Sequence, residues 1–536
     1  MRDGRAASTA GRRIRWGVLA LVALAAACGP PARDAGTVVY ASGADLESGD
    51  PLITIHPMAR QIQRHALYVT LVTLDSALRP APYFASAWSW SDDRRAMTLE
   101  LVPGLHWHDG VETTSADVVF TLDRARDPAT GSPRAADLGG VERAVAEGPY
   151  RVVVTFAGPQ AELPGWMSEL PVVPAHRLRD IAPAEQRQGS FGDTPLGNGP
   201  FRFVDRVRGQ RWTFARNEDF PAALGGPPTL ARLVVAVVDE ATTKFAGLVS
   251  GELHVAGVAP TMASLVERDP RLRVASYPVL FTTGLVFNAA RPPFDDVRVR
   301  RAVDLAVDRQ RVIDATLAGF GVPASGPVPP DNPLALASDV RRDPAAARAL
   351  LDSAGWRVGT GADGVRVRDG RPLRVTLITV GSADNAVEQL LQNDLARVGV
   401  ALEIRQLELG AFLTLARGAE KTFDLLITGI PGDLSLAYLA AMFDSRLAGG
   451  ALDYAAFHTP ELDAGFASAR AAASADARQA AWARVHRTLA REVPVAWLWH
   501  ARGVQGVSAR LRGVQMDLRG ELATVARWSL VPDDTP

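Results

Sequence analysis

The chain has 536 residues, of which 47% are hydrophobic and 22% are charged, and its formal net charge is −1. A chain of this length exceeds what one hydrophobic core can organise, so we expect two or three domains. The near-zero net charge gives no reason to expect nucleic acid as a partner. The single cysteine, Cys28, excludes an intramolecular disulfide and a cluster of thiolate metal ligands.

The first 28 residues have the pattern of an export signal. Several arginines precede an apolar run over 16–27, which is too short for a membrane span. Cys28 follows this run and three alanines, an arrangement that resembles a bacterial lipoprotein signal. In such signals the cysteine becomes the lipid-modified first residue. Ala25 stands where that pattern usually has leucine, and ordinary cleavage after Ala-x-Ala is the alternative.

The segment after the signal begins with a Pro/Gly linker over 29–36. A strand is expected over 37–40, a loop over 43–51, and a helix with apolar residues at helical spacing over 61–74. Further strands are expected over 99–101, 150–156 and 233–238, and a helix over 241–249.

Two histidines in this part of the chain raise the question of a metal site. His106 and His108 are alternate residues and would share one face of a strand. Two imidazoles without a third ligand nearby make a poor site, so we expect no bound metal. A turn at Asp109 and a helix beginning at Thr114 or Ser115 are the expected structure here.

The middle of the chain predicts a strand followed by two capped helices. The apolar run 285–287 ends at Asn288, and two prolines then force a turn. Asp295 or Asp296 can cap the helix that follows, and Asp308 can cap a second helix. Glycines 319 and 321 end that helix, before a proline-rich loop.

The C-terminal half alternates strands and helices. The G-x-G-x-x-G at 359–364 is not a dinucleotide site, because no strand precedes it and the alternation after it predicts a hairpin. Strands over 373–380 and 400–407 around a helix over 383–398 predict a β-α-β unit. The final expected elements are a strand over 423–427, a loop over 428–433, one long helix over 467–491 and a strand over 494–499.

Several short fragments, in the same order along the chain, resemble extracellular solute-binding proteins of family 5. This family serves ABC importers of dipeptides, oligopeptides and nickel. The matching fragments are Asp109-Gly110, Thr114–Thr121, Thr194–Phe201, Asn288, Pro293–Asp295, Val299–Ala302, Asp308-Arg309 and Gly321–Pro327.

The resemblance implies an α/β, two-lobed fold of the periplasmic-binding-protein type II class, with a third subdomain inserted in the first lobe. Lobe I would combine 37–48, 177–275 and 501–536. The inserted subdomain would occupy 49–176, and lobe II would occupy 276–500. The solute would be enclosed by a hinge motion of the lobes.

The resemblance also implies the function. The chain would be the extracytoplasmic component of an ABC importer, capturing a peptide or similar small solute and delivering it to a membrane permease. We expect a monomer without cofactor, lipid-anchored through Cys28 in the periplasm or on the outer face of the cell membrane. A signalling receptor with the same fold is an alternative. A hydrolase is a weaker one, because G-x-S-x-G, H-E-x-x-H and a cysteine nucleophile are absent from the sequence.

The same resemblance indicates where the solute would bind. In peptide-binding members an aspartate pairs with the amino terminus of the peptide, and Asp433 stands at this position. Ile430 replaces the usual tryptophan, so another cationic or a sugar-like solute stays open. The expected lining residues are Asp45, Leu46, Glu47, Phe281, Thr282, Thr283, Phe287, Gly429, Ile430, Gly432 and Asp433.

Overall fold

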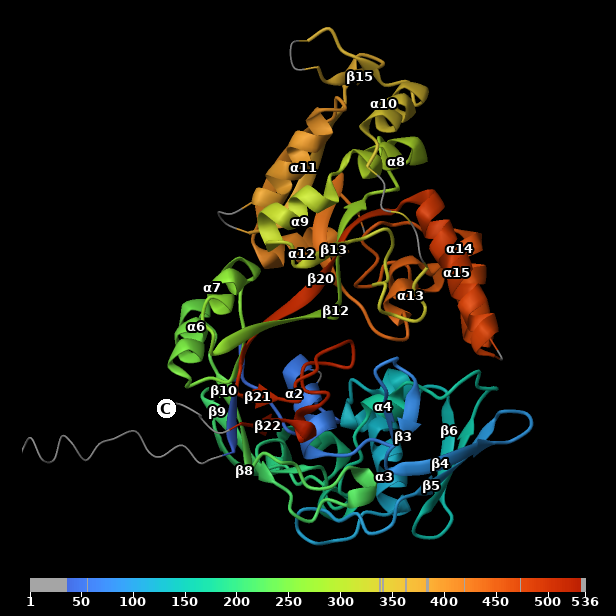
Figure 1. The fold of residues 1–536 in the computed structure, drawn as a ribbon. Coiled ribbons are helices and arrows are strands. Elements are labelled where there is room, and N and C mark those ends of the chain that lie inside the picture. The colour runs from blue at the N-terminus through green and yellow to red at the C-terminus, as the bar shows by residue number, and fades with distance from the viewer. Residues whose placement is uncertain are drawn as a thin grey trace, which may run out of the picture.

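The computed structural model describes residues 36–531, apart from 55, 337–338, 340–341, 362–363, 382–384, 419 and 473. The expected export signal and Cys28 lie outside the described residues. Figure 1 shows two lobes joined by two long strands, β12 (Leu272–Phe287) and β20 (Val495–Ser508). The blue to green part of the chain before β12 forms lobe I and the inserted subdomain, the yellow-green to orange-red part between β12 and β20 forms lobe II, and the red C-terminal end lies against lobe I.

One eleven-stranded sheet runs through both lobes. In lobe I, β1 pairs in parallel with β10 and β11, and in lobe II β17 pairs in parallel with β18 and β19. The order is β18 (Ala401–Leu407), β17 (Arg374–Val380), β19 (Leu425–Pro431), β12, β20, β11 (Val255–Gly257), β1 (Thr37–Ser42), β10 (Arg232–Val237), β9 (Arg211–Arg216) and β8 (Phe201–Val207), with β13 (Gly321–Pro323) beside β20.

The two long strands change register where they pass from one lobe to the other. Residues 272–278 of β12 pair with 502–508 of β20 on the lobe I side. On the lobe II side, 282–286 pair with 495–500, and register shifts separate Pro278 from Thr282 and Thr283 from Gly284. Because a bulge bends a strand and leaves groups unpaired, this interruption is the natural position for a hinge.

The inserted subdomain has its own antiparallel sheet but shares a hydrophobic core with lobe I. Its strand order is β4 (Ala85–Trp90), β5 (Ala96–Leu101), β7 (Arg151–Phe156) and β6 (Val141–Ala146). Helix α3 (Ser115–Arg126) begins with a capping box between Thr114 and Asp117. The core around Trp107 in the inserted subdomain is continuous with the core around Val38 in lobe I.

The sheet of lobe II carries helices on both faces. One core contains residues of α8 (Val297–Ala306), α9 (Arg309–Leu317), α10 (Pro344–Ser353) and α11 (Ala386–Ala396). The other contains residues of α12 (Leu409–Arg417), α13 (Ala437–Phe443), α14 (Pro460–Ala471) and α15 (Ala475–Glu492). Both faces are therefore buried, as is typical of parallel strands.

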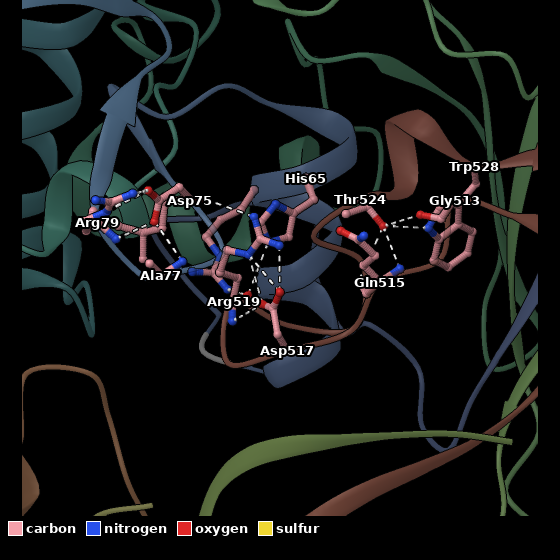
Figure 2. Close-up of polar contacts among 12 residues, drawn as sticks. His65, Asp75, Ala77, Arg79, Gly513, Gln515, Asp517, Arg519, Thr524 and Trp528 are labelled. Carbon is pink, nitrogen blue, oxygen red and sulfur yellow. Dashed lines mark hydrogen bonds and ion pairs between the residues drawn. The ribbon is translucent and has the colours of Figure 1, made fainter. Parts of the chain in front are cut away.

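The C-terminal segment packs into the core of lobe I. Trp528 is fully buried in the lobe I core, and its indole N–H donates to Thr524 Oγ1 at 3.1 Å. Figure 2 shows this segment beside the segment of His65, and Arg519 donates to the carbonyl of Leu74 at 3.2 Å. The short strands β21 (Leu511–Arg512) and β22 (Ser529–Leu530) pair with each other.

Several local predictions are confirmed. Asp296 caps α8 by accepting from the N–H of Arg298, and Asp308 caps α9 by accepting from the N–H of Arg311. The strands β17 and β18 pair in parallel and flank α11 in the chain, as the β-α-β prediction required. The glycine-rich segment at 359–364 connects the antiparallel strands β14 (Arg357–Val358) and β15 (Arg366–Arg368), which form a hairpin.

Two helix predictions were wrong in extent. The helix expected over 61–74 consists of α2 (Pro57–Ile62) and a π-helical turn over Gln63–Leu67, and β2 (Val72–Leu74) follows. The chain becomes extended at Tyr68, where aromatic and β-branched residues favour strand geometry. The long helix expected over 467–491 is divided into α14 and α15, and the Ser474 hydroxyl caps the second helix.

The remaining described α-helices and β-strands lie mainly in lobe I and the inserted subdomain. They are β3 (Pro80–Pro82), α4 (Trp166–Glu169), α5 (Ala175–Leu178), α6 (Ala241–Ser250), α7 (Ala263–Glu267) and β16 (Arg371–Pro372).

Candidate ligand-binding site

The carboxyl ends of the parallel strands in lobe II point towards lobe I. Pro431, the last residue of β19, pairs with Phe281, which lies beside the register shift in β12. Ligands in open α/β sheets bind outside the carboxyl ends of the strands. Residues 428–431 belong to β19, so the loop predicted over 428–433 is shorter than expected and begins at Gly432.

Asp433 lies just beyond β19 and is half-buried. Its carboxylate accepts from the backbone N–H groups of Ala437 and Tyr438, each at 3.2 Å, and from the Ser435 hydroxyl. These bonds satisfy free donors at the start of α13, whose N-cap residue is Leu436, so Asp433 stabilises the helix start from three positions before the N-cap. Within the described residues no arginine or lysine forms an ion pair with Asp433, and its negative charge is available to a cation.

A buried network of hydrogen bonds lies beneath the carboxyl end of β19. Thr282 Oγ1 lies 2.9 Å from Nδ1 of His500 and 3.3 Å from the carbonyl oxygen of Pro327, which also accepts from the Tyr438 hydroxyl at 2.9 Å. Burial lowers the pKa of His500 to about 4, so the imidazole is neutral at physiological pH. Thr282 thus connects β12, β20 and the proline-rich loop.

Phe281 presents an aromatic ring at the interruption of β12 between Pro278 and Thr282. Its side chain is 42% exposed, and the ring lies over Gly429. A Cβ atom at position 429 would be 2.0 Å from Phe281 Cζ, so the ring can occupy this position only above a glycine. Ile430 and Thr283 are buried, whereas Gly432 is partly exposed and donates its N–H to the carbonyl of Leu280 at 2.8 Å.

Phe287 is the predicted lining residue that the structure places elsewhere. It is fully buried in the core of lobe II, with its ring centroid 5.0 Å from that of Phe294. It lies six positions beyond Phe281 along β12, away from the hinge and inside the layer of helices. No surface of Phe287 is left for a solute, so this expectation is corrected.

The predicted residues of lobe I are largely engaged in the structure of the lobe itself. Asp45 accepts from the indole N–H of Trp212 at 2.7 Å, the N–H of Gly209 at 2.8 Å and the guanidinium of Arg206 at 3.1 Å. Burial raises the pKa of Asp45, but these bonds outweigh it and lower the pKa to about 2. Leu46 is buried, and Glu47 is exposed with a positive φ of 64°.

A cavity of about 350 Å³ lies between the inserted subdomain and lobe II, and we call it the interlobe cavity. The loop 159–165 lines one side, and residues of α14, α15 and the start of α13, among them Trp482, line the other. Arg478 of α15 contacts Glu162 of the loop in an ion pair that joins the two parts of the molecule. Ser435, the hydroxyl partner of Asp433, is also in the wall.

Sequence reasoning did not find the interlobe cavity. Arg478 is one of many arginines in an Ala/Arg-rich helix, and nothing local distinguishes it from its exposed neighbours. The loop 159–165 has no motif that points to a ligand. Only the three-dimensional arrangement brings this loop and α15 together.

The comparisons with known proteins agree with this architecture. The family model described as bacterial extracellular solute-binding proteins, family 5 Middle, matches residues 79–445. Protein XP55 of Streptomyces lividans is 29% identical over 462 residues, which cover 85% of this chain and 82% of that protein. The probable di/tripeptide-binding protein 5 of Pseudomonas aeruginosa is 28% identical over 469 residues, covering 81% of this chain and 85% of that protein.

A solved structure shows the same fold. The ABC transporter substrate-binding protein CtaP of Listeria monocytogenes superposes with a TM-score of 0.81 at 20% identity, covering 93% of this chain and 100% of that chain. This likeness confirms the type II fold that the sequence predicted.

Because the family model spans more than half of the chain, the chain belongs to the extracellular solute-binding proteins of family 5. It is the solute-binding component of an ABC importer, as the sequence predicted. In the described part of the chain, no helix combines the length and apolar character needed to cross a membrane. The described residues also contain no cluster of three or more side chains suited to hold a metal ion.

Proposed function

We propose that this protein captures a short peptide between its lobes and delivers it to a membrane permease without chemical change. The observation that carries the proposal is the interlobe cavity, which is lined from both sides of the molecule. Its wall includes Ser435, whose hydroxyl donates a hydrogen bond to Asp433. Its volume of about 350 Å³ is within the range of small-molecule sites and suits a di- or tripeptide. The relative in Pseudomonas aeruginosa named as a di/tripeptide-binding protein supports the same class.

Asp433 would hold the amino terminus of the peptide. The carboxylate carries a full negative charge, and its present partners are two backbone N–H groups and one hydroxyl. An ammonium group would add a charge-assisted hydrogen bond, which is stronger than a neutral one. The backbone of Gly429 to Gly432 and the ring of Phe281 lie outside the wall of the interlobe cavity and would contact a peptide that extends from the cavity towards the hinge.

Native mass spectrometry with an equimolar pool of di-, tri- and tetrapeptides tests this function. We expect retention of one or two peptide lengths with little preference for sequence. The same protein is then exposed to a pool of mono- and disaccharides. Retention of sugars with no retention of any peptide would refute the proposal.

We also propose that Cys28 carries lipid and holds the protein, as a monomer, at the outer face of the cell membrane or in the periplasm. The support is the position of the only cysteine directly behind the apolar run of the signal. Metabolic labelling with a fatty acid should mark the wild-type protein and leave Cys28→Ser unlabelled. Equal labelling of both forms would show that Cys28 is not the modified residue.

A further inference from the structure

The two lobes also touch on the side of the hinge strands opposite the interlobe cavity. A small apolar core of lobe I, formed by residues of α6, α7, β12 and β20, lies on this side. Phe320, a residue of lobe II, packs against this core, and we call this contact the rear contact. Figure 1 shows α6 and α7 to the left of the two long strands, with α9 above them, whereas α4, α13 and α15 lie to the right.

The backbone holds Phe320 from both sides. The residue follows α9, which ends in a left-handed turn at Gly319 with a φ of 83°. The N–H of Phe320 then donates to the carbonyl of Leu317 at 2.8 Å. Directly after Phe320, β13 pairs with β20, and Gly321 lies opposite Ala501. The ring is therefore fixed at the point where β20 passes from lobe II to lobe I.

The rear contact and the interlobe cavity lie on opposite sides of one hinge. The register shifts between Pro278 and Gly284 of β12 lie between them. A rotation about this point that widens the cavity brings the end of α9 closer to lobe I. The partly buried ring of Phe320 already occupies the space there. Because packed apolar groups resist further compression, the ring opposes this rotation.

We propose that Phe320 sets the balance between open and closed arrangements of the lobes by limiting how far the cavity side can open. The rear contact is present in the arrangement in which both lobes line the cavity, so it also stabilises this arrangement. A solute held between the lobes requires the closed arrangement, and its affinity therefore depends on how often that arrangement is populated. The inference concerns the motion of the lobes, whatever the solute is.

A distance measurement between the lobes tests this inference. Cys28 is the only cysteine, so in the Cys28→Ser chain fluorophores can be attached specifically at Val111→Cys and Val358→Cys. These positions lie in the inserted subdomain and in lobe II and are 43% and 67% exposed. Without any solute, Phe320→Ala should lengthen the mean distance and broaden its distribution in energy-transfer measurements. Phe320→Leu, which keeps an apolar side chain, should have a smaller effect.

Solute binding gives a second measurement on the same variants. Phe320→Ala should weaken binding of the tripeptide that is best retained in native mass spectrometry by about three- to tenfold in calorimetry, because the closed arrangement loses part of a buried aromatic contact. If no peptide binds to the wild type, the proposed function fails, and the distances without solute still decide the role of Phe320.

Phe457→Ala is the matched control. Phe457 is also a partly buried phenylalanine of lobe II, but it packs within that lobe, where the guanidinium of Arg300 lies 5.4 Å from the centre of its ring. Its replacement should lower stability and leave the distance and the affinity unchanged. A distance distribution of Phe320→Ala that equals that of the wild type, or that shifts to shorter distances, would overturn the inference.

Discussion

Asp433 has two roles that can be separated by the choice of replacement. The structure shows that it accepts from two N–H groups in the first turn of α13, and the proposed function adds that it holds a solute ammonium group. Asp433→Ala removes both the acceptor and the charge. It should lower the free energy of unfolding by about 0.5–2 kcal/mol, as expected for a lost helix cap. It should also weaken solute binding by about 2–5 kcal/mol, or roughly thirtyfold or more, because an enclosed ammonium group would lose its partner.

Asp433→Asn removes the charge and keeps one of the two acceptor oxygens, because Oδ1 accepts from Ala437 and Oδ2 accepts from Tyr438. The free energy of unfolding should therefore fall by less than in Asp433→Ala, whereas the loss of affinity should persist in full. Urea unfolding and calorimetry with the best-retained tripeptide measure the two effects. Asp296→Ala is the control, since Asp296 caps α8 and should cost stability without affinity. Wild-type affinity in Asp433→Asn would refute the anchoring role, and unchanged stability in Asp433→Ala would refute the capping role.

Three further predictions concern stability. The pKa of Asp45 is lowered from 3.8 to about 2, so the ionised carboxylate stabilises the fold fully above pH 3.8 and loses this contribution as the pH falls towards about 2. In Asp45→Asn, the free energy of unfolding measured in urea should therefore depend less on pH over this range. Burial raises the pKa of Glu521 from 4.5 to about 7, so stability should decline as the pH rises through this window, and Glu521→Gln should remove the decline between pH 5 and 8. Gly429→Ala should cost about 1–3 kcal/mol by displacing the ring of Phe281, and Phe281→Ala in the same chain should recover most of this loss. A steeper acid transition in Asp45→Asn, an unchanged pH profile in Glu521→Gln, or additive losses in the double variant would contradict the respective assignments.

The chemistry of neighbouring residues was sufficient to predict many of the helices and strands. The caps at Asp296 and Asp308 depend on a carboxylate next to free N–H groups, so the residue type and its position predict them directly. The order of the family fragments then implied how the elements pack. The division of the long C-terminal helix was missed because alanine and arginine favour a helix on both sides of the break at Ser474.

The site was less accessible to sequence reasoning because it depends on register and on distant contacts. Which residues of β12 face outward changes at its register shifts, so Phe281 and Phe287 could not be separated by alternation alone. The ion pair of Arg478 and Glu162 joins residues far apart in the chain, and no spacing rule links them. Asp433 was found only through the family resemblance. Its hydrogen bonds to the start of α13 could not be predicted, because the sequence analysis expected no helix after this loop.

The return of the C-terminal segment to lobe I also constrains the order in which the protein can fold. Lobe II is completed by α15 and the first half of β20, so all of its core residues have emerged before the last part of the chain is synthesised. The core of lobe I remains open until Leu511, Leu522, Val525 and Trp528 arrive. The core of lobe I can therefore be complete only when the end of the chain is in place, although most of its residues come first in the sequence.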